Sequence, residues 1–222
     1  MSRPDTASFP LWPMPLAIAV LFIVAAHLAL WLSIRDGHVP ACMPVLEGCA
    51  SISRAARHGL GNHVFRLMVL PCALLLGLHW WVAARWLGRG WCDVALLGAV
   101  AAVALAVYAA FLGTDGDTYR FLRRYGAVCF FGTGYLAQLR FLRGARGEAQ
   151  PGTRLFAAMA AVCVLTLVLG LGSVTASALV VDEGLKDRIE NALEWQLGWL
   201  LAAWYLLHAR LWWEARARLA FA

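Results

Sequence analysis

The sequence predicts an all-α membrane protein, a single transmembrane domain over residues 1–222 with six membrane-spanning helices. Three observations predict this fold class: 62% of the residues are hydrophobic, 14% are charged, and the apolar residues fall in long stretches. Soluble domains are about 45–50% apolar and about 25% charged, so this composition is typical of a chain that folds in lipid. Only one of the 19 basic residues is lysine, and most of the arginines flank apolar stretches. This pattern indicates membrane-flanking charge and excludes a nucleic-acid-binding surface.

The predicted spans follow from the thickness of the bilayer. A helix needs about 20 mostly apolar residues to cross a hydrocarbon core that is about 30 Å thick. Six stretches meet this requirement: 15–34, 64–87, 94–113, 123–142, 155–181 and 190–213. A signal peptide is the alternative for the first stretch, but its apolar part is long, Arg3 is its only leading cation and no small-residue cleavage site follows. We therefore expect a retained helix there.

Charge near the short connections predicts the orientation. Six helices place both termini on one side of the membrane, and this side carries ten of the 19 basic residues and four of the 13 acidic residues. The basic residues barely decide the matter, but Arg140, Arg143, Arg146 and Arg154 surround one short loop, which favours a cytoplasmic position for that loop. We therefore expect both termini in the cytoplasm and a multi-pass protein. The arginine-rich, lysine-poor composition points to a bacterial inner membrane.

Two residue patterns predict how the helices meet lipid and one another. Tryptophans near helix ends are typical of a membrane-interface belt, because an indole joins an apolar ring to a polar N–H. The expected belt consists of Trp80, Trp81, Trp86, Trp91, Trp212 and Trp213. Small side chains let helix backbones approach closely in lipid, and the fifth stretch carries such a face. Its members, which we expect to pack against another helix, are Gly170, Gly172, Ser173, Ala176 and Ser177.

The loop of residues 35–63 contains a cysteine pair and lies on the outer side in this topology. An oxidising compartment favours a disulfide between Cys42 and Cys49, which are seven residues apart around Pro44 and Gly48. A metal site with His38, His58 or His63 is the competing interpretation. Because the C-x-x-C spacing and an i, i+4 histidine pair are both absent from the sequence, we expect the disulfide and no metal.

A short surface helix is expected after the second cysteine. Residues 51–59 begin with serines suited to capping a helix and end at a glycine. Arg54 and Arg57 in this segment could bind phosphate headgroups, since guanidinium offers a planar bidentate donor, or could simply be solvated. Both interpretations stay open.

Charged residues near the outer ends of the spans are the best functional candidates, because charge at membrane depth is costly and usually faces protein or water. The candidate ligand-binding residues are Arg54, Arg66, Asp115, Asp117, Arg123, Glu190 and Glu194. We expect them to converge beneath the outer loop if the helices form one bundle. The alternative is mutual neutralisation, with Arg66 or Arg123 paired to Glu194 to hold the helix ends in register.

Catalysis has weaker sequence support. Asp115 with Asp117, and Glu190 with Glu194, supply paired carboxylates for acid–base work or metal binding. The sequence contains no H-E-x-x-H, nucleophile elbow or phosphate loop. His27, His79 and His208 lie in spans, where a single histidine more often makes one interhelical hydrogen bond than binds zinc. We expect no cofactor and no metal ligands, and we assign no catalytic residue.

Three stretches in order carry a family resemblance. Cys49 to Ser53, followed by Val64 to Arg66, is similar to a P-x-I-S segment and its following helix, with Ala50 in place of the proline. The polar loop 115–126 leads into a helix containing Gln138, and 190–195 is similar to a Glu-Trp pair that opens a last helix. Together these stretches resemble the DRAM/Sfk-type membrane family, which includes damage-regulated autophagy modulators, the post-GPI-attachment lipid-remodelling protein and the yeast Sfk protein. The resemblance implies a six-helix, non-channel protein associated with lipid remodelling, lipid distribution or membrane stress.

The leading hypothesis is therefore a lipid-handling membrane protein with an outer polar cluster that recognises a headgroup. Its expected partners are membrane lipids, with a membrane protein as a further possible partner and no nucleic acid. One alternative is an intramembrane lipid hydrolase or acyl transferase that uses Asp115, Asp117, Glu190 or Glu194. Another alternative is a scaffold that stabilises a partner through the small-residue face of the fifth stretch.

Overall fold

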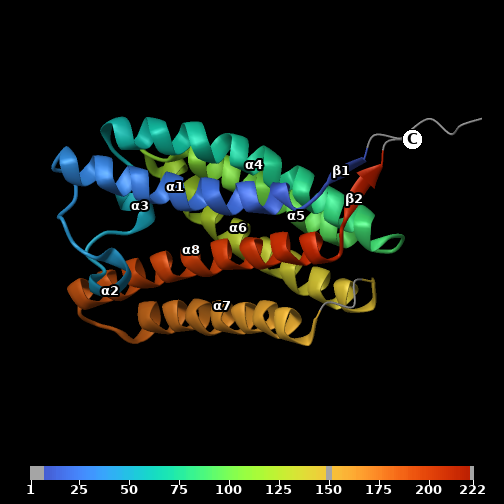
Figure 1. Cartoon of the computed structure of the whole chain (residues 1–222). Helices are drawn as coiled ribbons and strands as arrows, with labels where there is room; N and C mark the ends of the chain where they lie inside the picture. Colours follow the sequence, from blue (N-terminus) through green and yellow to red (C-terminus); the bar gives the residue numbers. More distant parts are fainter. Residues whose placement is uncertain (1–7, 149–151, 221–222) are drawn as a thin grey trace, which may run out of the picture.

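The computed structural model of the chain describes residues 8–148 and 152–220, and helices dominate it (Figure 1). The six long helices are α1 (Pro13–Arg35), α4 (Gly59–Leu87), α5 (Cys92–Phe111), α6 (Asp117–Glu148), α7 (Thr153–Leu179) and α8 (Glu183–Glu214). Two short helices, α2 (Pro44–Glu47) and α3 (Ile52–Ala55), lie in the first loop. Each predicted apolar stretch overlaps one long helix, so the all-helical prediction is confirmed.

Four helices are long and apolar enough to cross a membrane: α1, α4, α5 and α7. Large apolar side chains also face outward, including Leu67 and Leu74 on α4, Val103 on α5 and Val174 on α7. Many outward-facing apolar side chains of this kind suit lipid and not water. The chain is therefore a membrane-type helical protein. In the part of the chain that the structure describes, α6 and α8 fall short of the same hydropathy standard.

The long helices form one bundle with two distinct ends. Helix α1 packs between α4 and α8, α5 packs between α4 and α6, and α7 packs mainly against α8. Figure 1 shows α2 and α3 at one end of the bundle and the strands β1 (Ser8–Pro10) and β2 (Arg218–Ala220) at the opposite end. We call these the loop end and the terminal end.

The terminal ribbon was not expected from the sequence. Strands β1 and β2 pair antiparallel, with Phe9 opposite Leu219, and the Leu11 amide extends the pairing by donating to the Ala217 carbonyl at 3.0 Å. The ribbon joins the two ends of the described chain. Both ends therefore lie on one side of the bundle, as an even number of long helices requires.

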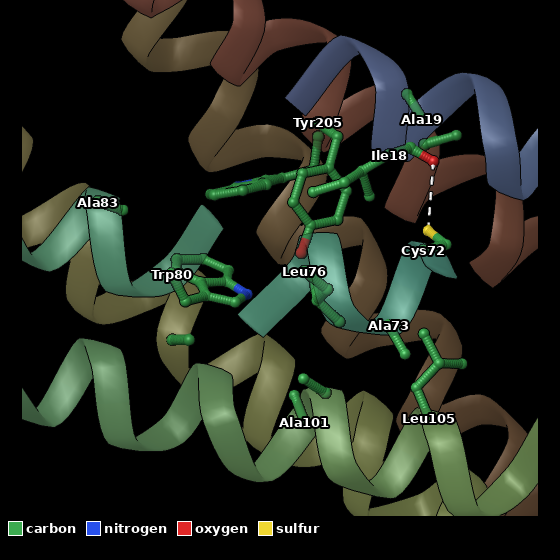
Figure 2. Close-up of a cluster of buried hydrophobic side chains, with 14 of the residues drawn as sticks. Ile18, Ala19, Cys72, Ala73, Leu76, Trp80, Ala83, Ala101, Leu105 and Tyr205 are labelled. Carbon is green, nitrogen blue, oxygen red and sulfur yellow. Dashed lines mark hydrogen bonds between the residues drawn. The ribbon is translucent and has the colours of Figure 1, made fainter. Parts of the chain in front are cut away.

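The core between α1, α4, α5 and α8 is apolar and closely packed. Figure 2 shows Ile18, Leu76, Leu105 and Tyr205 from these four helices converging on one another. Small residues permit the close approach, and Gly98 is the clearest case because a Cβ there would overlap the Trp80 side chain. Tight packing of this kind holds bundles together in lipid, which offers no hydrophobic drive between helices.

Two expectations about lipid and helix contacts need correction. Trp80 and Trp212 are fully buried, so they do not belong to an interface belt, whereas Trp81 and Trp213 are 47% and 62% exposed. Gly170 and Gly172 on α7 do not pack as expected, because a Cβ at either position would meet no described atom within 4 Å. Helix α7 uses other residues to contact α8, and much of its small-residue face stays uncovered.

Candidate functional site at the loop end

The disulfide in the first loop is confirmed. Cys42 and Cys49 are bonded, with their Cα atoms 6.6 Å apart, and they enclose α2. Gly48 ends α2 in the left-handed region, with φ of +61°. A Cβ at Gly48 would overlap the carbonyl of Arg188 on α8, so only glycine fits where the loop meets α8.

Side chains of α8 hold the loop by its backbone. Asn191 Nδ2 donates to the Gly48 carbonyl at 2.9 Å, and Trp195 Nε1 donates to the Ala50 carbonyl at 2.9 Å. Glu194 accepts a hydrogen bond from the Ser53 amide at 3.0 Å. These α8 residues lie three and four apart, so they share one helical face. The Glu-Trp pair at 194–195 therefore has a clear role in docking the loop.

Helix α3 confirms the expected surface helix, although it is shorter than the segment 51–59. Ser51 caps it, because its hydroxyl accepts a hydrogen bond from the Arg54 amide at 3.0 Å. The Arg54 guanidinium pairs with Asp187 on α8 at 3.3 Å. Both side chains are exposed, so this ion pair contributes about 1 kcal/mol or less. Arg57, which follows α3, is exposed and makes no ion pair with any residue in the described ranges.

The connection from α5 to α6 is held by amide and guanidinium donors. Arg123 Nη1 donates to the Thr114 and Phe111 carbonyls at the end of α5, and the Phe111 carbonyl also accepts hydrogen bonds from the amide and hydroxyl of Thr114. The buried Asn62 donates to the Ala56 and Leu112 carbonyls at 3.0 and 2.9 Å, and so ties the end of α3 to the end of α5. The sequence indicated Arg123 but gave no signal for Asn62 beyond a polar residue near the start of an apolar helix.

Several predicted residues converge around Tyr108 of α5. The charges of Glu194, Arg57 and Arg123 all act on the Tyr108 hydroxyl, and the Ser53 side chain interacts with it. We call Ser53, Arg57, Tyr108, Arg123 and Glu194 the loop-end cluster. Ser53 and Arg57 come from the first loop, and the other three come from α5, α6 and α8, so the convergence predicted beneath the loop is found for Arg123 and Glu194. Tyr108 was missed, because a tyrosine within an apolar stretch carries no motif.

Other predicted residues lie outside this cluster or have different partners. Asp117 forms an exposed ion pair with Arg120, one turn along α6. Glu190 accepts a hydrogen bond from the Ser177 hydroxyl of α7. Asp115 is exposed and acts on the cluster only through its charge on Arg123.

The proposed neutralisation of Glu194 by Arg66 or Arg123 is not found. Arg66 is half-buried on α4 and makes no ion pair among the residues that the structure describes. Arg123 binds backbone carbonyls, and the Glu194 carboxylate binds a backbone amide. For Arg123 and Glu194, side chain to backbone hydrogen bonds therefore take the place of the expected ion pair.

The loop end gathers guanidinium, hydroxyl and carboxylate groups. Within the described ranges, no three His, Cys, Asp or Glu side chains gather to hold a metal ion. Arg57 and Arg123 bring two guanidiniums close to the hydroxyls of Tyr108 and Ser53, a donor set that suits a phosphate group. Comparisons with protein-family models, curated proteins and solved structures gave no match for this chain.

Proposed function

We propose that the chain is a lipid-handling membrane protein whose loop-end cluster binds the phosphate of a lipid headgroup. The observation that carries this proposal is the loop-end cluster itself, in which Arg57 and Arg123 gather around the hydroxyls of Tyr108 and Ser53, with Glu194 and Asp115 as the nearby negative charges. Neither guanidinium is hydrogen-bonded to a carboxylate in the described part of the chain. A bound phosphate would accept charge-assisted hydrogen bonds from both guanidiniums.

The proposed topology places this cluster at the outer surface of a bacterial inner membrane. In it all six long helices cross the bilayer and both termini are cytoplasmic. Helices α6 and α8 have 32 residues each, about 48 Å at a rise of 1.5 Å per residue, and lie beside the four apolar helices. The disulfide at the loop end supports an extracytoplasmic position for that end, because disulfides persist in oxidising compartments.

The resemblance to the DRAM/Sfk-type family is part of the same proposal. Two of the stretches that carry the resemblance are in direct contact, since Glu194 binds the Ser53 amide and Trp195 binds the Ala50 carbonyl. Contact between segments 141 and 145 residues apart in sequence supports a shared structural role for them. A role in lipid remodelling or lipid distribution follows from this proposed membership.

Reconstitution tests the proposal. The purified protein is analysed for co-purified lipids by mass spectrometry, and its effect on transbilayer lipid movement is measured in vesicles. We expect an anionic phospholipid to be enriched with the wild type and lost with Arg57→Gln, whose side chain forms no structural hydrogen bond in the described chain. Arg210→Gln is the matched control, because Arg210 pairs with Glu214 at the terminal end. Identical lipid profiles for the wild type and Arg57→Gln would contradict the proposal.

The hydrolase or acyl transferase alternative has no specific support. Its candidate carboxylates have other partners, with Asp117 paired to Arg120, Glu190 bonded to Ser177 and Glu194 bonded to the Ser53 amide. Because they are not assembled around one reacting position, the geometry favours binding over catalysis.

A scaffold function is the second candidate, and the uncovered face of α7 favours it. Helix α7 is the least buried of the four apolar helices, and Gly170 and Gly172 are open to close approach. A partner helix could pack against these glycines. Stoichiometric co-purification of another membrane protein that is abolished by Gly170→Leu would support the scaffold, and a chain that purifies alone would argue against it.

A further inference from the structure

A cavity of about 620 Å³ lies at the terminal end, between the terminal ribbon and the last turn of α8. Its walls combine aromatic and charged side chains, among them Trp12, Trp212, Trp213, Glu214 and Arg216. Trp12 directly precedes α1 and Glu214 ends α8, so the cavity lies where two long helices end. Exposed tryptophans at helix ends, such as Trp213 at 62% exposure, are typical of the headgroup level of a membrane. A phospholipid headgroup is therefore the ligand that these surroundings supply.

The backbone holds Arg216 in a conformation that usually belongs to glycine. Helix α8 ends in a Schellman motif, in which the Arg216 amide donates to the Trp213 carbonyl at 3.1 Å and the Ala217 amide donates to the Trp212 carbonyl at 2.9 Å. The motif needs a left-handed residue just after the helix, and Arg216 takes this position with φ of +48°. A Cβ is strained in this region, so an arginine there costs backbone stability. Strain of this kind is typical of functional positions.

The charged groups of the cavity are of both signs. The Arg216 side chain is exposed and forms no ion pair or hydrogen bond in the described ranges. Glu214 uses its Oε1 to accept a hydrogen bond from Arg210 at 2.7 Å, and its Oε2 has no partner within those ranges. Arg218 also lines the cavity. A zwitterion can match a guanidinium and a carboxylate together, whereas a purely anionic group would meet the Glu214 carboxylate.

We propose that this cavity binds the headgroup of phosphatidylethanolamine, with the phosphate on Arg216 and the ammonium between Glu214 and the tryptophans. A guanidinium offers phosphate a planar fork of donors. A primary ammonium has three N–H donors, so it can bind the second carboxylate oxygen of Glu214 and still be attracted to an indole face. The volume is within the usual range for ligand pockets, about 300–1,000 Å³. The inference is independent of the loop-end phosphate site.

Native mass spectrometry tests the inference. The full chain in detergent is titrated with short-chain phosphatidylethanolamine, and with phosphatidylcholine and diacylglycerol that have the same acyl chains. We expect phosphatidylethanolamine to bind more tightly than phosphatidylcholine, because the N-methylated headgroup cannot donate to Glu214. Diacylglycerol should bind most weakly. Glycerophosphoethanolamine, which has the headgroup without acyl chains, should not compete, because the aromatic walls contact the apolar part of a lipid.

Three variants locate the site. Arg216→Asn should weaken phosphatidylethanolamine binding by about 10- to 100-fold, the loss expected for a charge-assisted hydrogen bond. Asparagine tolerates the left-handed region, so without lipid this variant should unfold at the temperature of the wild type or higher. Glu214→Gln should abolish the preference for phosphatidylethanolamine over phosphatidylcholine. Arg89→Asn is the matched control, because Arg89 is exposed between α4 and α5 at the same end of the bundle (Figure 1) and does not line the cavity.

The Arg57→Gln background separates this site from the loop-end cluster. The effect of Arg216→Asn should be the same with and without Arg57→Gln, whether or not the loop end binds phosphate. The proposal would be overturned by unchanged binding or a clearly lower unfolding temperature with Arg216→Asn, or by an equal loss with Arg89→Asn. Phosphatidylcholine binding as tight as that of phosphatidylethanolamine, competition by the soluble ester, or an Arg216→Asn effect that disappears with Arg57→Gln would overturn it too.

Discussion

Trp195→Phe is expected to loosen the first loop from α8. Trp195 is fully buried, and its Nε1 donates to the buried Ala50 carbonyl at 2.9 Å. Phenylalanine keeps an aromatic ring but leaves that carbonyl unsatisfied, which costs about 1–3 kcal/mol. The smaller ring leaves a cavity that adds about 1 kcal/mol. The free energy of unfolding should therefore fall by about 2–4 kcal/mol.

The assay is an SDS titration of the protein in detergent micelles, followed by circular dichroism. Trp199→Phe is the matched control, because Trp199 lies one turn further along α8 and contacts the same His27 ring, at 5.2 Å against 5.3 Å for Trp195. Trp199 is 42% exposed, so its substitution should cost less than about 1 kcal/mol. Equal losses for the two variants would refute the view that the Trp195 hydrogen bond docks the loop.

Two further predictions concern the disulfide and the core. The bond between Cys42 and Cys49 should block maleimide labelling at both positions until it is reduced, and its loss should lower the free energy of unfolding by about 2–3 kcal/mol in the chain-entropy model. With Cys42→Ser, a membrane-impermeant maleimide added from outside should label Cys49. Labelling from the cytoplasmic side alone would invert the proposed topology. Gly98→Ala should lower the free energy of unfolding by about 1–3 kcal/mol, because the added methyl group overlaps the Trp80 side chain. Gly132→Ala is the control and should lower it little or not at all, because Gly132 faces open space. Similar losses for the two alanine variants in the same SDS titration would contradict the overlap.

The long helices could be predicted because their signal is local. An apolar stretch of about 20 residues favours a helix in lipid, and each predicted stretch overlaps one long helix, although α6 and α8 start six and seven residues earlier than predicted. The disulfide could be predicted for the same reason, since it joins cysteines only seven residues apart in the sequence. The terminal ribbon was not, because β1 and β2 lie at opposite ends of the sequence and each has only three residues.

The candidate site could be predicted only in part. The sequence indicated Arg123 and Glu194, but it suggested ion pairing where the structure has hydrogen bonds to backbone groups. Backbone carbonyls and amides are present at every residue, so no sequence pattern marks the ones that a side chain will bind. The sequence also could not predict which tryptophans are buried. Trp80 and its neighbour Trp81 are the same residue type, and only the rotation of the helix decides that Trp80 faces the core.

The affinity of the protein for a phosphate-bearing lipid tests the central claim most directly. Native mass spectrometry compares a short-chain phosphatidylglycerol with a diacylglycerol that has the same acyl chains. A charge-assisted hydrogen bond contributes about 1.5–3 kcal/mol, so Arg57→Gln should weaken phosphatidylglycerol binding by about 10- to 100-fold and leave diacylglycerol binding unchanged. Equal affinity of the wild type for the two lipids, or no effect of Arg57→Gln, would contradict a phosphate site at the loop end.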